Sequence, residues 1–173
     1  LNRFSRDQIL ERRLGAPPAG SGTRVGEFLD RVASDKPTPG GGSVSALAGA
    51  LAGALGAMVA GLTLGRKKYA EVAAEMTATR AELEAARADL LRMVEEDSAA
   101  FDGMAAARRL PEGTPLEKET REKAMRESTD RAIEVPLAVA RRAAQVLEQL
   151  VAVAEKGNTN AVTDAGVGAL LAR

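Results

Sequence analysis

Apolar residues recur at three- and four-residue intervals along most of this chain, which is the spacing of one face of an α-helix. The pattern predicts a long amphipathic helix from about Tyr69 to Arg108, a range with no proline and no glycine before Gly103. It predicts a second long helix from about Leu116 to Glu155, which the ring of Pro136 should bend near Ala132. The apolar positions of the first helix are Val72, Met76, Leu83, Leu90, Val94, Phe101 and Met104.

The segment from Ser43 to Gly65 carries no charged residue and consists largely of alanine and glycine. Its length meets the requirement for a membrane span, but small side chains gain little from lipid. Gly49 and Gly53, at four-residue spacing, instead allow a second helix to approach closely. We therefore expect a buried central helix with Gly65 as its C′ residue, and an exposed part of its small-residue seam would favour dimerisation.

The first part of the chain is less regular. Two short helices are expected at about 4–14 and 26–34, separated by a flexible linker over 16–22 that is rich in proline and glycine. A last helix should start near Ala161. Since no segment shows the period-two alternation of a strand, we expect an all-α fold, a bundle of long antiparallel helices around the buried Ala/Gly-rich helix. Residues 1–24 would be a helical arm and linker, and residues 25–173 the helical domain.

Composition narrows the possible functions. The 173 residues suffice for one domain with a single core. The charges balance at 24 basic and 24 acidic residues and aromatic residues make up 2%, so we expect neither nucleic-acid nor membrane binding. The absence of cysteine fits a cytoplasmic protein. The absence of histidine removes the Ser-His-Asp triad and histidine metal ligands, so proton transfer must use carboxylate, lysine, tyrosine or water.

Two prolines and three consecutive glycines precede the expected central helix, in the stretch from Pro37 to Ser43. Gly40, Gly41 and Gly42 let a ligand approach the main chain, and the free N–H groups at the following helix start attract negative charge. Phosphate or carboxylate would suit such a site. The alternative is a tight connection between helices with Ser43 as the N-cap.

Asp97 is an acid on the apolar face of the helix predicted over 69–108. Its neighbours three and four positions away are Met93, Val94, Ala100 and Phe101. Burial raises the pKa of a carboxyl group by disfavouring the anion, so an acid here could hold a proton near neutral pH and deliver it to a leaving group. The alternative is a buried Asp that is satisfied by a basic or backbone partner.

The remaining candidates for ligand binding are Arg66, Lys67, Lys68, Tyr69, Asn158 and Asp164. The three basic residues suit a polyanionic tail, although they also suit a solvated helix end. The tyrosine, the only one in the chain, could stack on a flat ligand or simply pack. The Asn and the Asp could recognise a ligand, or they could cap and stabilise the start of the last helix.

The run from Lys36 to Tyr69, KPTPGGGSVSALAGALAGALGAMVAGLTLGRKKY, closely resembles the signature of the cyclodeaminase/cyclohydrolase family. This family is the domain joined to formiminotransferase in a bifunctional folate enzyme. The resemblance covers nearly everything from Val25 onward. It continues through Glu95–Phe101, Arg109–Pro111, Val135–Leu137, Gly157–Asn158 and Asp164.

The resemblance implies an all-α subunit that dimerises and binds tetrahydrofolate derivatives between helices, without a metal or a tightly bound cofactor. It implies first a cyclodeaminase, a lyase that converts 5-formiminotetrahydrofolate into 5,10-methenyltetrahydrofolate and ammonia, and alternatively a methenyltetrahydrofolate cyclohydrolase. The family's catalytic aspartate corresponds to Asp97, as proton donor to ammonia or as acid and base for water. The loop 40–43 would hold pterin or glutamate atoms, the cluster 66–68 the glutamate tail, and Asp164 the pterin edge.

Two departures from the family pattern are visible. Gly61 stands where similar sequences often have a larger polar residue such as Asn, and the last helix stops before an expected Asn-rich closing segment. They motivate a third interpretation, a folate-binding relative that has lost turnover.

Overall fold

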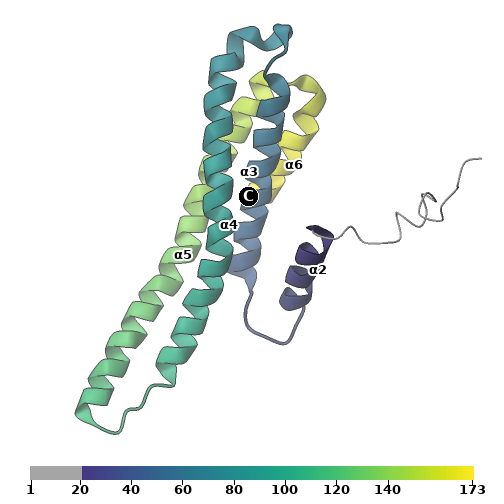
Figure 1. Cartoon of the computed structure of the whole chain (residues 1–173). Coiled ribbons are helices and arrows are strands. Elements are labelled where there is room, and N and C mark those ends of the chain that lie inside the picture. The colour runs from purple at the N-terminus through teal and green to yellow at the C-terminus, as the bar shows by residue number, and fades with distance from the viewer. Residues whose placement is uncertain (1–20) are drawn as a thin grey trace, which may run out of the picture. The chain divides into compact units, whose positions relative to one another are not determined.

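The computed structural model describes residues 21–173, and all regular structure in that range is helical (Figure 1). This confirms the predicted all-α class. The chain divides into two compact units, Leu1–Thr38 and Pro39–Arg173. In chain order the helices are α2 (Ser21–Val32), α3 (Gly41–Thr63), α4 (Ala73–Arg108), α5 (Pro115–Lys156) and α6 (Val162–Ala172), with short 3-10 helices η2 (Lys67–Val72) and η3 (Thr159–Ala161).

The first unit contributes α2 to the described residues. The predicted helix at 26–34 is confirmed in kind, but its predicted start was wrong, because the helix begins at Ser21 and includes Gly22 of the predicted linker. No proline separates these residues from the apolar pattern, so the helix extends one turn further towards the N-terminus. The helix predicted at 4–14 lies outside the described residues. The apolar face of α2 consists of Val25, Phe28, Leu29 and Val32.

Helix α3 is the central helix of the second unit and packs against α4, α5 and α6 (Figure 1). Its glycines leave room that neighbouring leucines fill. A Cβ atom added at Gly56 would lie 2.9 Å from Leu83 Cδ1 and 2.9 Å from Leu150 Cδ2, and one at Gly49 would lie 3.1 Å from Leu90 Cδ1. The leucines of α4 and α5 therefore interlock with the small residues of α3. This confirms the predicted Ala/Gly-rich central helix.

The same helix passes the length and apolarity test for a membrane span within the described part of the chain. It has 23 residues, and its most apolar window has a mean hydropathy of 1.8. Half of that window is buried inside the protein, as in the core helix of a globular domain.

Helix α3 ends as the sequence predicts. Gly65 has a φ of 75°, a left-handed conformation that favours glycine at the C′ position. The buried hydroxyl of Thr63 donates to the carbonyl of Val59 at 2.8 Å and accepts the N–H of Asn158 at 2.8 Å. These bonds attach the end of α3 to the turn between α5 and α6.

Helices α4 and α5 form a long antiparallel pair (Figure 1). Helix α5 starts with a capping box, in which Thr114 Oγ1 accepts the N–H of Glu117 at 3.2 Å and Glu117 Oε2 accepts the N–H of Thr114 at 2.8 Å. Pro115 at the first helical position requires no N–H partner. The predicted limits of this helix, 116 and 155, each differ from the observed ones by a single residue.

The start of α4 differs more from its prediction. Tyr69 has a φ of −114° and a ψ of 19°, which is not helical, and the α-helix begins only at Ala73. Pro136 lies inside α5, which continues through it. The bend expected near Ala132 stays a prediction.

Candidate active site

Asp97 lies on α4 beside the first turn of α3. The side chain of Ser43 is fully buried, and its hydroxyl donates to Asp97 Oδ2 at 2.9 Å. The same hydroxyl oxygen lies 3.1 Å from Oγ of Ser98, which is also buried. Packing of α3 on α4 thus joins two candidates that the sequence analysis treated separately, the glycine loop and the aspartate.

Gly42 packs directly against the carboxylate of Asp97. A Cβ atom added at Gly42 would overlap Oδ1 and Cγ of Asp97 and would lie 2.8 Å from Oδ2. The sequence analysis expected glycine to let a ligand approach the main chain, and the group that approaches at Gly42 is a side chain of the protein itself. Glycine is required at this position because any other residue would displace the carboxylate.

Ser43 is not the N-cap of α3. The N-cap is Gly40, which makes no side-chain capping bond, and Ser43 lies within the first turn with its hydroxyl turned to Asp97. That alternative was therefore wrong, because the helix begins at Gly41 and Ser43 lies inside its first turn. The N–H groups of this turn lack partners within the helix, so the turn carries a partial positive charge that complements a carboxylate.

The carboxylate of Asp97 is half-buried rather than enclosed. Val94 and Ala100 are buried, but Phe101 on the same predicted face is 40% exposed. Among the described residues, Oδ1 of Asp97 accepts no hydrogen bond, whereas Oδ2 is held by Ser43. Oδ2 is thus fixed by a hydrogen bond, and Oδ1 packs against the main chain of Gly42.

Tyr69 lies at the other end of α3. Its hydroxyl oxygen accepts the N–H of Thr159 at 3.1 Å and lies 3.4 Å from Thr159 Oγ1. Lys68 Nζ is 5.1 Å from the centroid of the tyrosine ring, within range of a cation–π contact. The side chain therefore joins η2 to the start of η3 through its hydroxyl group. A role in stacking on a ligand stays a prediction.

These contacts shift the pKa of the Tyr69 hydroxyl, and the shift can be measured by titration. The hydroxyl and the N–H of Thr159, with Lys68, lower the pKa of Tyr69 from 10.0 to about 8, because they stabilise the phenolate. The phenolate absorbance of the chain's only tyrosine should therefore rise with a midpoint near pH 8 in the folded protein and near pH 10 in denaturant. Since the folded pKa is the lower one, this contribution to stability is present above pH 10 and is lost as the pH falls through 8.

Thr159→Val is the matched variant for this titration, because it removes the hydroxyl and keeps the N–H. The midpoint should move part of the way back towards 10. A midpoint near 10 in the folded wild-type protein would contradict the assignment.

Asn158 is buried and has its hydrogen bonds satisfied within the protein. Besides its N–H bond to Thr63, its Nδ2 donates to the carbonyl of Leu62 at 3.3 Å and its Oδ1 accepts the N–H of Asn160 at 3.1 Å. The side chain caps η3 and supports the turn, so the structure favours the capping role over direct ligand recognition.

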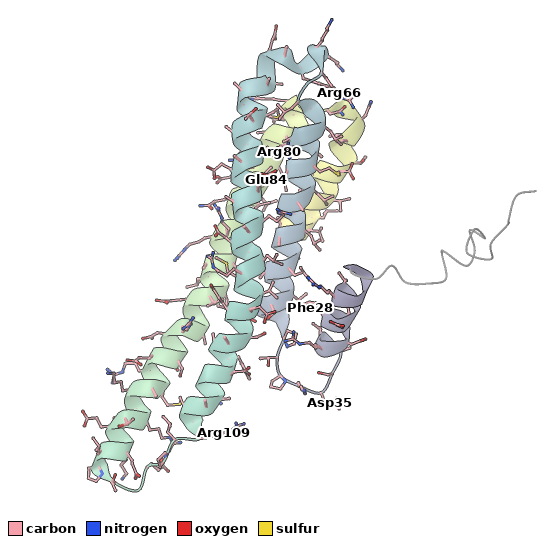
Figure 2. The ribbon with its side chains drawn as sticks, in the orientation of Figure 1. Phe28, Asp35, Arg66, Arg80, Glu84 and Arg109 are labelled. Atoms are coloured by element: carbon pink, nitrogen blue, oxygen red, sulfur yellow. The ribbon has the colours of Figure 1, made fainter. Side chains whose placement is uncertain are left out.

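The other candidates at this end are accessible. Arg66, Lys67 and Lys68 are exposed, and Figure 2 shows Arg66 beyond the end of α3. Asp164 is half-buried in the first turn of α6, where a carboxylate complements the helix N-terminus. A cationic surface and an acidic side chain thus lie near the C-terminal end of α3.

Within one chain, the candidates form two groups at opposite ends of α3. Gly40 to Ser43 and Asp97 lie at its first turn, and the cluster 66–68, Tyr69 and Asn158 follow its last turn. A helix of 23 residues is ~35 Å long at 1.5 Å per residue. The structure brings Asp97 to the glycine loop, but it does not bring the basic cluster to either of them.

Gly61 faces the side chain of Arg80, which pairs with Glu84 at 2.9 Å (Figure 2). A Cβ atom there would lie 3.5 Å from Arg80 Nη1, an ordinary contact distance. Unlike Gly56, Gly61 is not required by close packing, and a larger residue would meet the arginine.

The sequence analysis missed Ser98. A small polar residue one position after Asp97, on a stripe with Val94 and Phe101, is a weak signal, and only the packing of α3 reveals its contact with Ser43. Among the described residues, no group of three or more acidic side chains is arranged to hold a metal ion.

Comparison with known proteins identifies relatives of this chain. Methenyltetrahydrofolate cyclohydrolase of Methylorubrum extorquens is 43% identical over 154 residues, which cover 89% of this chain and 74% of that protein. Formimidoyltransferase-cyclodeaminase of Gallus gallus is 34% identical over 167 residues, and the chain spans only 31% of it. The crystal structure of formiminotetrahydrofolate cyclodeaminase from Thermotoga maritima superposes with a TM-score of 0.74 at 34% identity, covering 86% of this chain and 70% of that one.

The sequence model of the formiminotransferase-cyclodeaminase family matches residues 24–173. This range includes the glycine loop, Asp97 and the basic cluster. The chain therefore belongs to the formiminotransferase-cyclodeaminase family.

Proposed function

We propose that this chain is an enzyme that performs acid–base chemistry at the methenyl bridge between N5 and N10 of tetrahydrofolate. The observation that supports this most directly is the half-buried carboxylate of Asp97, which is held by Ser43 and Gly42 at the first turn of α3. Ring closure and ring opening at this bridge change no oxidation state. They require a bound folate and a positioned proton donor or acceptor.

Two reactions of this kind are candidates. In the cyclohydrolase reaction, water adds to the methenyl carbon and loses one proton, which Asp97 accepts. The bond to N5 then breaks as the new hydroxyl group loses its proton to become the formyl carbonyl and N5 takes up a proton, so that the 10-formyl compound and one net proton are formed. The higher identity and coverage of the Methylorubrum extorquens relative favour this reaction, and we place it first.

In the cyclodeaminase reaction, N10 attacks the formimino carbon and its proton passes to the former imino nitrogen. Asp97 adds a second proton as this nitrogen departs, so that 5,10-methenyltetrahydrofolate and ammonia are formed. The similarity to the Thermotoga maritima cyclodeaminase favours this second candidate. Ammonia release with 5-formiminotetrahydrofolate separates the two reactions. Turnover with ammonia identifies the deaminase, and turnover of the methenyl compound alone identifies the hydrolase.

The two groups of candidate residues become one site if two copies of the chain associate. Helix α3 carries a stripe of four exposed apolar residues. The first three are seven residues apart, and the fourth follows four residues after the third. Pairing of two such stripes in antiparallel orientation would place the basic cluster of one subunit beside Asp97 of the other. The cluster 66–68 would then bind the glutamate tail of a folate whose reactive carbon lies at the partner's aspartate. The stripe consists of Val44 (40% exposed), Leu51 (50%), Met58 (42%) and Leu62 (43%).

Mixing two inactive variants tests this shared site. Asp97→Asn and the double variant Lys67→Glu/Lys68→Glu should each be nearly inactive alone. If the two groups come from different subunits, a mixed dimer contains one intact site, so an equal mixture should regain about a quarter of the wild-type activity. No regain, with mixed dimers shown to form, would place both groups of residues in the same subunit or in separate sites.

A further inference from the structure

Ser43 has a single hydroxyl proton, and it donates that proton in a hydrogen bond to Asp97. Its hydroxyl donates to Oδ2 at 2.9 Å, so in the 3.1 Å contact with Ser98 the Ser43 oxygen must be the acceptor. The hydrogen bonds therefore run in one direction, from Ser98 to Ser43 to Asp97. Both serines are buried, Ser43 completely and Ser98 to 8% exposure, so bulk water does not compete for these bonds.

The carboxylate is also restrained from its other side. The main chain of Gly42 is so close that a single added carbon would overlap Oδ1 and Cγ. The hydrogen bond from Ser43 to Oδ2 and the contact with the Gly42 main chain together favour one orientation of the carboxylate. In that orientation Oδ1 accepts no hydrogen bond from the described residues.

We propose that Ser43 and Ser98 are positioning residues that fix the orientation of the Asp97 carboxylate for proton exchange with the substrate. This inference rests on the proposed function of Asp97. Ser43 acts directly on Oδ2, and Ser98 acts through Ser43 by strengthening it as a donor. Neither serine needs to touch the substrate.

Kinetics of Ser43→Ala and Ser98→Ala test the proposal, with Ser45→Ala as the matched control. Ser45 is on the same helix but is exposed. We expect Ser43→Ala to lower kcat by about 10- to 100-fold with KM nearly unchanged, because a hydrogen bond to a charged group is lost without a change in folate contacts. Ser98→Ala should lower kcat by about 3-fold, since it weakens the donor without removing it. Ser45→Ala should behave as wild type.

A double-mutant cycle separates positioning from a general structural role. In an Asp97→Asn background the substitution Ser43→Ala should change kcat by less than about 2-fold, because the group it orients has already lost its function. An equal loss of kcat in both backgrounds would overturn the proposal. The proposal would also be overturned if Ser43→Ala and Ser98→Ala had the same kcat as Ser45→Ala. If Ser43→Ala does not fold, the same comparison of kcat in the wild-type and Asp97→Asn backgrounds is made with Ser98→Ala.

The carboxyl carbon of Asp97 gives a readout that needs no turnover. In protein labelled with ¹³C at aspartate, its signal is identified by its loss in Asp97→Asn. The signal should shift in Ser43→Ala and, by less, in Ser98→Ala, and should stay in place in Ser45→Ala. If wild type turns over neither folate, the proposed function fails, while an unchanged carboxyl signal in both serine variants would overturn the positioning role itself.

Discussion

Replacing Asp97 by Asn is expected to lower kcat by about 10²–10⁴-fold, the usual contribution of a positioned acid or base. The amide has nearly the size of the carboxylate, so the packing against Gly42 should persist and folate affinity should change little. Direct titration of folate binding, together with kcat, measures the two effects separately. Loss of binding with kcat preserved would assign Asp97 to recognition instead of proton transfer.

Glu95→Gln is the control for this substitution. Glu95 lies on the same helix and is exposed, and the change removes one negative charge in the same way. Activity within about 2-fold of wild type is expected, as for most exposed sites away from the chemistry. A loss as large as that of Asp97→Asn would show that net charge, and not the position of one carboxylate, sets the rate.

The second large effect is expected for Gly42→Ala. Alanine favours helix over glycine by about 1 kcal/mol, so α3 itself should not suffer. The new methyl group would, however, occupy the place of the Asp97 carboxylate and force it away from Ser43. Displacement of a reacting group by about 1 Å can cost 10²-fold in rate, and we expect at least about that loss in kcat.

Gly103→Ala provides the comparison, because it is also a helical glycine and a Cβ atom there meets nothing within 4 Å. It should keep full activity and gain slightly in thermal stability. If Gly42→Ala were as active as Gly103→Ala, the carboxylate would have to function in another orientation, and the close approach at Gly42 would carry no catalytic meaning.

Much of the fold was predictable because apolar residues recur along the chain at the three- and four-residue spacing of a helix face. The break at Gly65, the turn before Pro115 and the uncharged segment from 43 each have a local cause, and the structure confirms the helices that they delimit. The boundary at Tyr69 was not predictable from local pattern. Tyr69 is non-helical, and its hydroxyl bonds to Thr159, which lies 90 residues further along the chain.

For the candidate site, the sequence indicated residue types and missed their pairing. Asp97 and the glycine loop each stood out locally, but a chain pattern does not show that Ser43 points at Asp97 instead of capping its own helix. The order of the segments did place the basic cluster at the opposite end of a helix ~35 Å long from the glycine loop. It did not show that Asp97 packs at the loop end of that helix. Such relations depend on which faces pack together, and packing is set by contacts between segments that are distant in sequence.

The most direct test of the proposed function is the absorbance of 5,10-methenyltetrahydrofolate, followed with wild type and Asp97→Asn in parallel. One assay starts from the methenyl compound and one from 5-formiminotetrahydrofolate. We expect wild type to accelerate the loss of absorbance in the first assay or its appearance in the second, and Asp97→Asn to lose about 10²–10⁴-fold of that acceleration. Folded wild-type protein that binds folate but is silent in both assays, or an Asp97→Asn variant as fast as wild type, would contradict it.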